Sequence, residues 1–87
     1  MSYSRDTLDA AHRHSSNHRE ELEQSKVCGC FYCFRTCATT EIEEWIRGES
    51  RTALCPHCGV DSVIGSASGY PVGEQKFLQA MHVRWFG

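Results

Sequence analysis

Four of the six cysteines stand in two Cys-x-x-Cys pairs, an arrangement typical of a metal site. The first pair is Cys30 and Cys33, and the second is Cys55 and Cys58. Two thiolates separated by two residues can bind one ion from a single tight turn, and a second such turn completes the sulfur tetrahedron that zinc prefers. Twenty-one residues separate the pairs, close to the spacing of structural zinc sites. The sequence therefore predicts one Zn²⁺ ion per chain, held by these four cysteines.

The length of the chain indicates why it would need a metal. Its 87 residues are enough for one domain. A chain of this size buries only about 60–65% of the surface that it exposes when unfolded. Small domains with such marginal cores are usually stabilised by disulfides, a metal or a partner. We therefore expect the bound ion to decide whether the domain folds.

The cellular compartment affects how the cysteines are interpreted. The first residues contain no apolar run of the kind that a secretory signal needs. No stretch approaches the roughly 18 apolar residues of a membrane span. We therefore expect a cytoplasmic protein, in which Cys-x-x-Cys pairs bind metal more often than they form disulfides. Iron is an alternative to zinc, since four thiolates also suit it, and a disulfide or redox pair is the other alternative.

Two cysteines lie outside the paired motifs. Cys28 precedes Cys30 by two residues, and Cys37 follows Cys33 by four. Cys28 and Cys33 are too far apart for one tight turn, so Cys30 is the favoured ligand and Cys28 the alternative. For Cys37 we expect a small buried thiol, and the alternative is a reactive or regulatory thiol.

The histidines offer a second, weaker metal hypothesis. His12, His14 and His18 lie close together, and the last two are one helical turn apart. That spacing suits two imidazoles on one metal, but no metalloprotease motif accompanies it. We therefore expect a solvated polar helix. We expect His57 to be exposed beside the metal, where it can donate a hydrogen bond to a sulfur, and His82 to lie at the edge of the last helix.

The elements that position the cysteines predict an α+β fold. Residues 1–25 are expected to form a polar helical arm, partly disordered at its start, in which Asn17 and Glu20 fit a helix cap. Residues 26–87 are expected to form the zinc-binding domain. Short strands are predicted within 27–34, at 52–54 and at 60–64. The glycine- and serine-rich residues 65–69 are predicted to form a loop.

Two more helices are predicted in the zinc-binding domain. Residues 40–48 begin with a capping box at Thr40, carry apolar side chains at i, i+3 and i+4, and end at Gly48. These apolar side chains are Ile42, Trp45 and Ile46. The second helix is predicted over 74–85, with Phe77, Leu78, Met81 and Trp85 on one face. Trp45 is the expected packing partner of that face. The fold class is therefore a small zinc-ribbon-like domain with a central helix, a C-terminal helix and an N-terminal helical arm.

The charge balance disfavours nucleic acid as the partner. Nine Lys and Arg stand against eleven Asp and Glu, for a net charge of −2. Nucleic-acid binding draws most of its affinity from cations that contact phosphates. A tetrathiolate zinc site would add further negative charge to the middle of the chain.

Three stretches together resemble a family of small bacterial cytoplasmic proteins of uncharacterised function. They are CGCFYC at 28–33, EIEEW at 41–45, and TALCPHCGVDSVIGSASGYP at 52–71. The resemblance starts near His18 and runs to Phe86. It implies a bacterial, cytoplasmic, zinc-binding protein with a zinc-ribbon-like fold and added helices, and it implies no activity. Cys37 departs from the pattern of the family.

Three classes of function are compatible with these features. The favoured one is a structural zinc module that binds a protein or peptide, because four cysteine ligands leave no open position for catalysis. The expected contact surface is the segment 65–71 with Tyr32 and Trp85. The first alternative is a thiol-based redox enzyme or a metal-dependent enzyme that uses Cys28, Cys37 or the histidines. The second alternative is a nucleic-acid-binding zinc ribbon.

Overall fold

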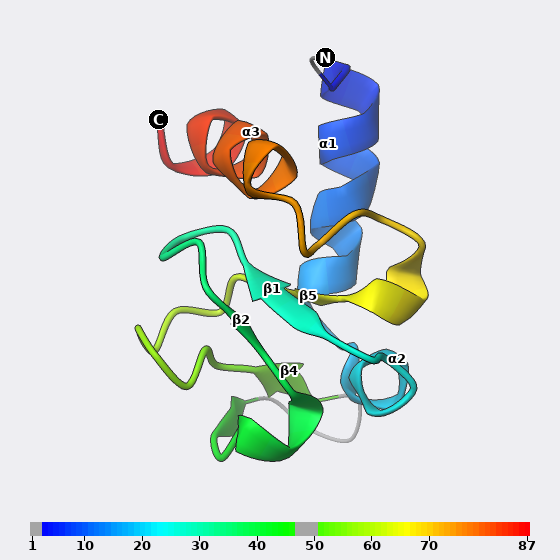
Figure 1. Cartoon of the computed structure of the whole chain (residues 1–87), viewed down its shortest axis with the longest axis vertical. Helices are drawn as coiled ribbons and strands as arrows, with labels where there is room; N and C mark the ends of the chain where they lie inside the picture. Colours follow the sequence, from blue (N-terminus) through cyan, green and yellow to red (C-terminus); the bar gives the residue numbers. More distant parts are fainter. Residues whose placement is uncertain (1–2, 47–50) are drawn as a thin grey trace.

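The computed structural model describes residues 3–46 and 51–87, which form an α+β fold (Figure 1). The helices are α1 (Arg5–His12), α2 (Arg19–Glu23) and α3 (Gln75–Phe86). The strands are β1 (Cys28–Cys30), β2 (Thr36–Cys37), β3 (Trp45–Ile46), β4 (Thr52–Ala53) and β5 (Val63–Gly65). Short 3-10 turns cover Arg13–Ser15, Thr39–Glu41 and Ser66–Ser68. No helix among these described residues is long and apolar enough to cross a membrane.

A small antiparallel sheet lies in the middle of the molecule. Its strand order is β2-β1-β5, so the strand with the first cysteines is central. Gly29 pairs with Thr36 on one side and Ile64 on the other. A Cβ atom at Gly29 would lie 2.2 Å from the carbonyl oxygen of Val72. The glycine therefore lets the chain that leads to α3 pass directly over β1.

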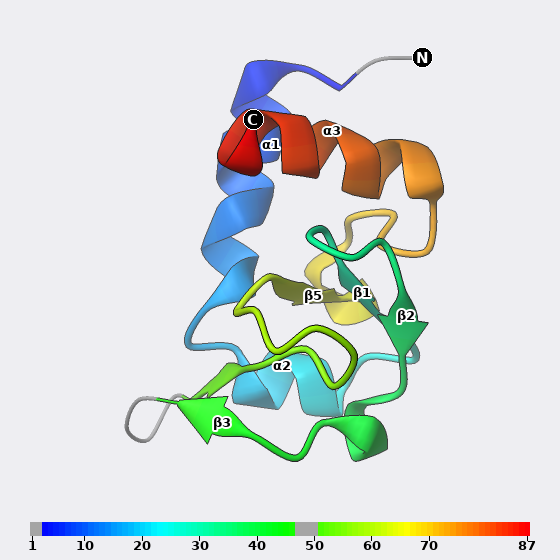
Figure 2. The ribbon, with the colours of Figure 1, turned by 90° about the vertical axis from the view of Figure 1, so that its left-hand side faces the viewer.

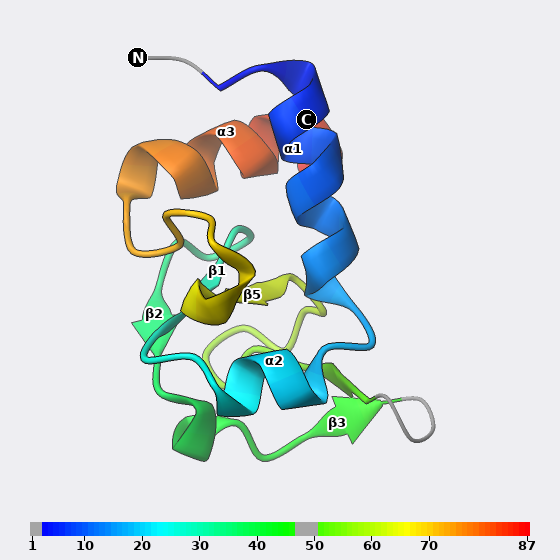
Figure 3. The same cartoon turned by 90° about the vertical axis from the view of Figure 1, so that its right-hand side faces the viewer.

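Helices α1 and α3 lie together at one end of the molecule (Figures 2 and 3). The apolar side of α1 contributes Leu8 and Ala11 to a shared core. The other members of this core are Phe31, Ile64, Val72, Phe77, Leu78 and Met81. The last helix is confirmed, and it begins one residue later than predicted, at Gln75.

A second core lies at the opposite end, and half of its buried residues are cysteines. It gathers Leu22, Cys28, Cys30, Cys37, Ile42, Ala53, Cys55 and Val63. Leu22 of α2 is fully buried there. The predicted arm therefore supplies apolar side chains to both cores. The division between residues 1–25 and 26–87 stays a prediction.

The predicted central helix is wrong for the residues that the structure describes. A 3-10 turn at Thr39–Glu41 is followed by extended backbone at Ile42 and by strand β3. This strand pairs with β4, so that Trp45 lies opposite Ala53. The strand partner comes from beyond the segment, and isoleucine and tryptophan suit a strand as well as a helix. The predicted end at Gly48 lies outside the described residues.

The predicted contact between Trp45 and the last helix is also wrong. Trp45 packs against the second core, whereas the buried side chains of α3 belong to the first. The Arg19 guanidinium lies 5.0 Å from the centre of the Trp45 ring. This contact joins β3 to α2, whose N-cap is His18 rather than the predicted Asn17.

Candidate metal centre

The structure brings together the four cysteines of the two Cys-x-x-Cys motifs. Cys30 ends β1, Cys33 lies in the turn to β2, and Cys55 and Cys58 lie between β4 and β5. Their sulfur atoms all lie within 4.8 Å of one another. In the described part of the chain, this is the one group of three or more His, Cys, Asp or Glu residues arranged to hold a metal ion.

The spacing of the sulfur atoms fits a single tetrahedral ion. The Sγ atoms of Cys30 and Cys58 are 3.7 Å apart, as are those of Cys33 and Cys55. A regular tetrahedron with zinc–sulfur bonds of about 2.3 Å places its sulfur atoms about 3.8 Å apart. Two of the sulfur–sulfur distances therefore match those of a tetrahedral zinc site.

The two turns that carry the cysteines have the same backbone structure. In the first, the amide of Cys30 donates to the Arg35 carbonyl at 2.9 Å, and the amide of Phe34 donates to the Cys30 carbonyl at 3.0 Å. Residues 55–60 repeat both hydrogen bonds, at 3.0 and 2.9 Å. The residue after the second cysteine has a positive φ in each turn, 66° at Phe34 and 77° at Gly59. Two turns of the same backbone structure thus direct their cysteine side chains toward one shared cluster of sulfur atoms.

Each sulfur atom accepts a backbone N–H from the residue two positions later. Tyr32 and His57 donate to the first cysteine of their turns, at 3.4 Å. Arg35 and Val60 donate to the second. Such hydrogen bonds favour the thiolate, which is the form that binds a metal.

Burial and the neighbouring thiols shift the pKa values of three of these cysteines. Burial and the neighbouring Cys30 thiol raise the pKa values of Cys33 and Cys58 above their usual range, against the backbone hydrogen bonds. Burial also acts to raise the pKa of Cys55, but the backbone N–H groups of His57 and Cys58 outweigh it and the pKa is lowered. Adjacent thiolates therefore disfavour one another, and a shared cation would remove that penalty.

The Ser62 hydroxyl contacts the sulfur of Cys30, one of the candidate ligands. Ser62 is fully buried, and its Oγ lies 3.0 Å from the Cys30 sulfur. A hydroxyl in this position can donate to a thiolate and orient it.

Replacement of this hydroxyl should weaken metal binding without removing a ligand. We expect Ser62→Ala to lower zinc affinity by about 10- to 100-fold, the usual effect of losing a group that orients a ligand. Competition with a zinc chelator measures this change. Ser16→Ala is the matched control, because Ser16 is exposed. Equal affinities for Ser62→Ala and the control would contradict this role.

Cys28 and Cys37 lie outside the group of four. They face each other across β1 and β2. A hydrogen bond from the Cys37 thiol lowers the pKa of Cys28 from its usual value to about 7, and the same contact raises the pKa of Cys37. Cys37 is buried, as expected. The structure therefore favours Cys30 over Cys28 as the candidate ligand.

The three N-terminal histidines have separate surroundings instead of a shared one. The His12 ring lies 3.9 Å from the Trp85 ring, measured between centres. His14 Nδ1 lies 2.9 Å from the Glu21 carboxylate. His18 is buried, with Nδ1 donating to the His14 carbonyl at 2.6 Å and Nε2 accepting from the Ala53 amide at 3.0 Å. The expectation of a solvated polar helix is therefore wrong at His18, which joins the helical segment to β4.

The buried position of His18 should make stability depend on pH. Burial lowers its pKa below 6.5, against its hydrogen bond to His14 and the nearby Glu21 carboxylate. In the unfolded chain, His18 therefore binds a proton near pH 6.5, whereas in the folded protein it binds one only at lower pH. Stability should fall as the pH drops below that value, by up to about 1.4 kcal/mol per pH unit.

Urea unfolding at several pH values between 7.5 and 5 tests this effect. We expect the free energy of unfolding to depend less on pH in His18→Gln than in the wild type. Protonation of the cysteine cluster is common to both proteins and cancels in the difference. Equal pH dependence in the two proteins would show that His18 does not contribute.

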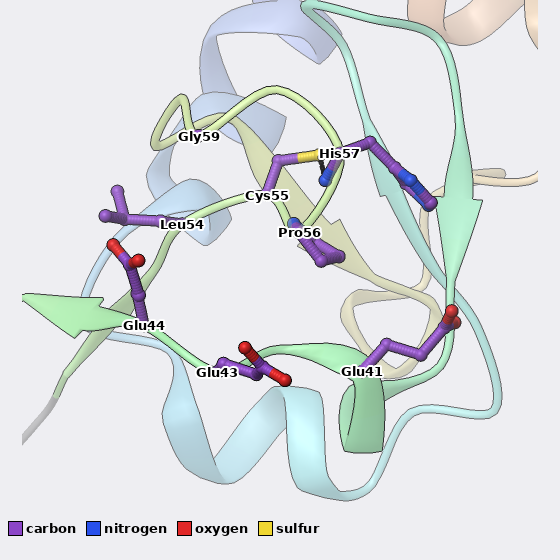
Figure 4. Close-up of a pocket in the computed structure, with 8 residues that line it drawn as sticks. All are labelled: Glu41, Glu43, Glu44, Leu54, Cys55, Pro56, His57 and Gly59. Atoms are coloured by element: carbon purple, nitrogen blue, oxygen red, sulfur yellow. Dashed lines mark hydrogen bonds between the residues drawn. The ribbon is translucent and has the colours of Figure 1, made fainter.

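A cavity of about 410 Å³ lies beside the second cysteine turn (Figure 4). Its lining includes the carboxylates of Glu41, Glu43 and Glu44. The His57 imidazole points away from the Cys55 sulfur, while its backbone N–H donates to that atom. His57 is exposed, as expected, but the predicted bond to a sulfur comes from its main chain. The surroundings of this turn are acidic.

Sequence reasoning missed the positive φ of Phe34 and the pairing of Cys28 with Cys37. Phenylalanine gives no signal for a left-handed residue, whereas Gly59 does. The cysteine pairing follows from strand register, which the short strands do not specify.

Comparisons with protein-family models, with curated proteins and with solved structures find no match for this chain. The four-cysteine cluster is the feature of the structure that agrees with the resemblance to small bacterial zinc-ribbon-like proteins. The chain is an α+β protein with a four-cysteine cluster consistent with a zinc-ribbon-like metal site.

Proposed function

We propose that this protein holds one structural Zn²⁺ ion through Cys30, Cys33, Cys55 and Cys58, and that the resulting domain binds a protein or peptide partner in the bacterial cytoplasm. The observation that carries the metal proposal is the 3.7 Å spacing of two sulfur pairs within one four-thiol group. Four protein ligands close the coordination sphere of zinc, so no position is left for a reacting water or substrate. The family resemblance and the reduced thiols that zinc needs support the cytoplasmic part of this proposal.

Metal analysis tests the identity of the ion. Four thiolates also suit a single iron ion, which colours a protein strongly, whereas zinc is colourless. We expect native mass spectrometry and elemental analysis of the purified protein to show one zinc per chain. Iron in that position, or a chain without metal, would contradict the proposal.

The proposed partner site is the Tyr32–Phe86 patch, which we define as Tyr32 and Phe86. Both side chains are 44% exposed. Their rings meet edge to face, 5.0 Å apart at their centres. Exposed aromatic side chains of this kind are enriched in protein interfaces. The patch joins the first cysteine turn to α3, so that loss of the metal would disrupt it.

The segment 65–71 is a weaker candidate for contact with a partner, because it packs within the protein. The Ser66 hydroxyl accepts from the Lys26 amide, and the Ala67 amide donates to the Ser25 hydroxyl, both at 2.9 Å. A Cβ atom at Gly65 would lie 2.2 Å from the Ser25 oxygen. These contacts give the glycine- and serine-rich residues a structural role next to α2.

The partner proposal is tested by capture from host lysate with wild-type protein and with a Tyr32→Ser/Phe86→Ser variant. We expect one partner to be retained by the wild type, lost by the variant and lost after chelation. Glu20→Ser is the control, since Glu20 is exposed on α2. Retention that neither the variant nor the chelator changes would argue against this surface. Salt-dependent binding of RNA or DNA would favour the nucleic-acid alternative.

A further inference from the structure

The two cysteines outside the metal centre occupy opposed positions in the sheet. Cys28 on β1 pairs directly with Cys37 on β2, and Gly29 pairs with Thr36. Cys28 is fully buried, whereas Cys37 keeps 8% of its surface exposed. Strand β2 is at the edge of its sheet. Cys37 therefore lies on the edge strand and is the less deeply buried of the two.

The register places the two thiols within bonding reach. Residues that lie directly opposite in an antiparallel pair have Cα atoms about 4.5–5.5 Å apart, and their side chains share one face of the sheet. A disulfide needs a Cα separation of about 4.4–6.8 Å. The register therefore places the Cα atoms of Cys28 and Cys37 at a separation that a disulfide can span.

The pair also lies at the base of the turn that carries the first two candidate ligands. Cys30 and Cys33 both lie between Cys28 and Cys37 in the sequence. A bond between the outer two cysteines would close the loop that presents the inner two. Since neither outer cysteine belongs to the group of four sulfurs, such a bond would leave the four candidate ligands unchanged.

We propose that Cys28 and Cys37 form a redox-active dithiol, which a low-molecular-weight disulfide oxidises to an intramolecular disulfide while the metal remains bound. This site is additional to the structural zinc site and to the partner surface. It concerns a covalent modification of the hairpin formed by β1 and β2.

The reaction is thiol–disulfide exchange in two steps. One protein thiolate, formed by loss of its proton to solvent, attacks a sulfur of the small disulfide, and that S–S bond breaks to release one small thiolate. The second protein thiolate then attacks the resulting mixed disulfide and releases the other small thiolate. Two protein thiols are oxidised, one small disulfide is reduced to two thiols, and the two protons are returned to the products.

The test treats the purified metal-bound protein with hydroxyethyl disulfide and then maps the disulfide. Trypsin separates the two cysteines, because Arg35 lies between them. We expect peptides 27–35 and 36–47 to become linked, the intact chain to lose two hydrogen atoms, and the free thiols to fall from six to four after denaturation. Native mass spectrometry should show that the metal is retained.

Cys28→Ala and Cys37→Ala are the matched variants, and each should lose the link between the two peptides. Absence of that link in the wild type would overturn the proposal, as would a link that forms only after the metal has left. Because the result is read in the wild type, it does not depend on whether the variants fold. The metal content of the untreated protein tests the zinc proposal separately.

Discussion

Removal of the metal is expected to unfold this protein. Half of the buried residues of the second core are cysteines, and Leu22, Ala53 and Val63 are packed against them. In the proposed zinc site, chelation removes the cation that joins the two turns. Structural zinc supplies on the order of 10–16 kcal/mol of apparent binding free energy in small peptides, whereas a core of this size rarely supplies more than about 3–5 kcal/mol. Chelation should therefore abolish the helical circular dichroism signal together with the cooperative urea transition.

Substitutions in the cluster should reproduce the effect of chelation. We expect Cys55→Ser to lose the metal and to unfold cooperatively only at much lower urea than the wild type, if it folds at all. Cys37→Ser is the matched control, because this buried cysteine lies outside the group of four. A chelated protein that keeps the wild-type urea midpoint would show that the ion does not determine folding.

Truncation of Leu22 is expected to cost about 2–5 kcal/mol of unfolding free energy, the usual range for a buried leucine replaced by alanine. Leu22 is fully buried among the cysteines and Val63. Its backbone carbonyl accepts a hydrogen bond from the Thr39 hydroxyl. The segment that appears polar in the sequence thus contributes a buried apolar side chain to the cysteine-containing core. Urea unfolding of Leu22→Ala at saturating zinc measures the loss.

Val83→Ala serves as the comparison for this experiment. Val83 is also apolar but is 68% exposed, so we expect a change within about 0.5 kcal/mol. Similar stabilities for the two variants would mean that α2 contributes little to the core. In that case, residues 1–25 would behave as the separate arm that the sequence predicts.

Local patterns were sufficient for the parts of the fold whose signals are short-range. The spacing of the four clustered cysteines indicates a metal site, and the apolar residues of α3 recur with helical periodicity. The strands next to the cysteines were placed to within a few residues for the same reason. Each of these features depends on side chains that are close in the sequence.

The remaining features depend on partners that are distant in the sequence. Trp45 and Ile46 fit a helix by their spacing, but strand pairing with β4 determines their conformation. The sequence predicts an exposed His18, but its ring is buried and accepts a hydrogen bond from the backbone N–H of Ala53, 35 residues later. Cys28 and Cys37 become a pair only through the register of β1 and β2. No pattern within a short window of the sequence contains these relations.

X-ray absorption at the zinc edge of the purified protein tests the proposed metal site most directly. A zinc ion shared by the two matching turns predicts a shell of four sulfur atoms at about 2.3 Å, with no nitrogen or oxygen neighbour. A shell that includes nitrogen or oxygen, or a protein that carries no zinc, would contradict that geometry.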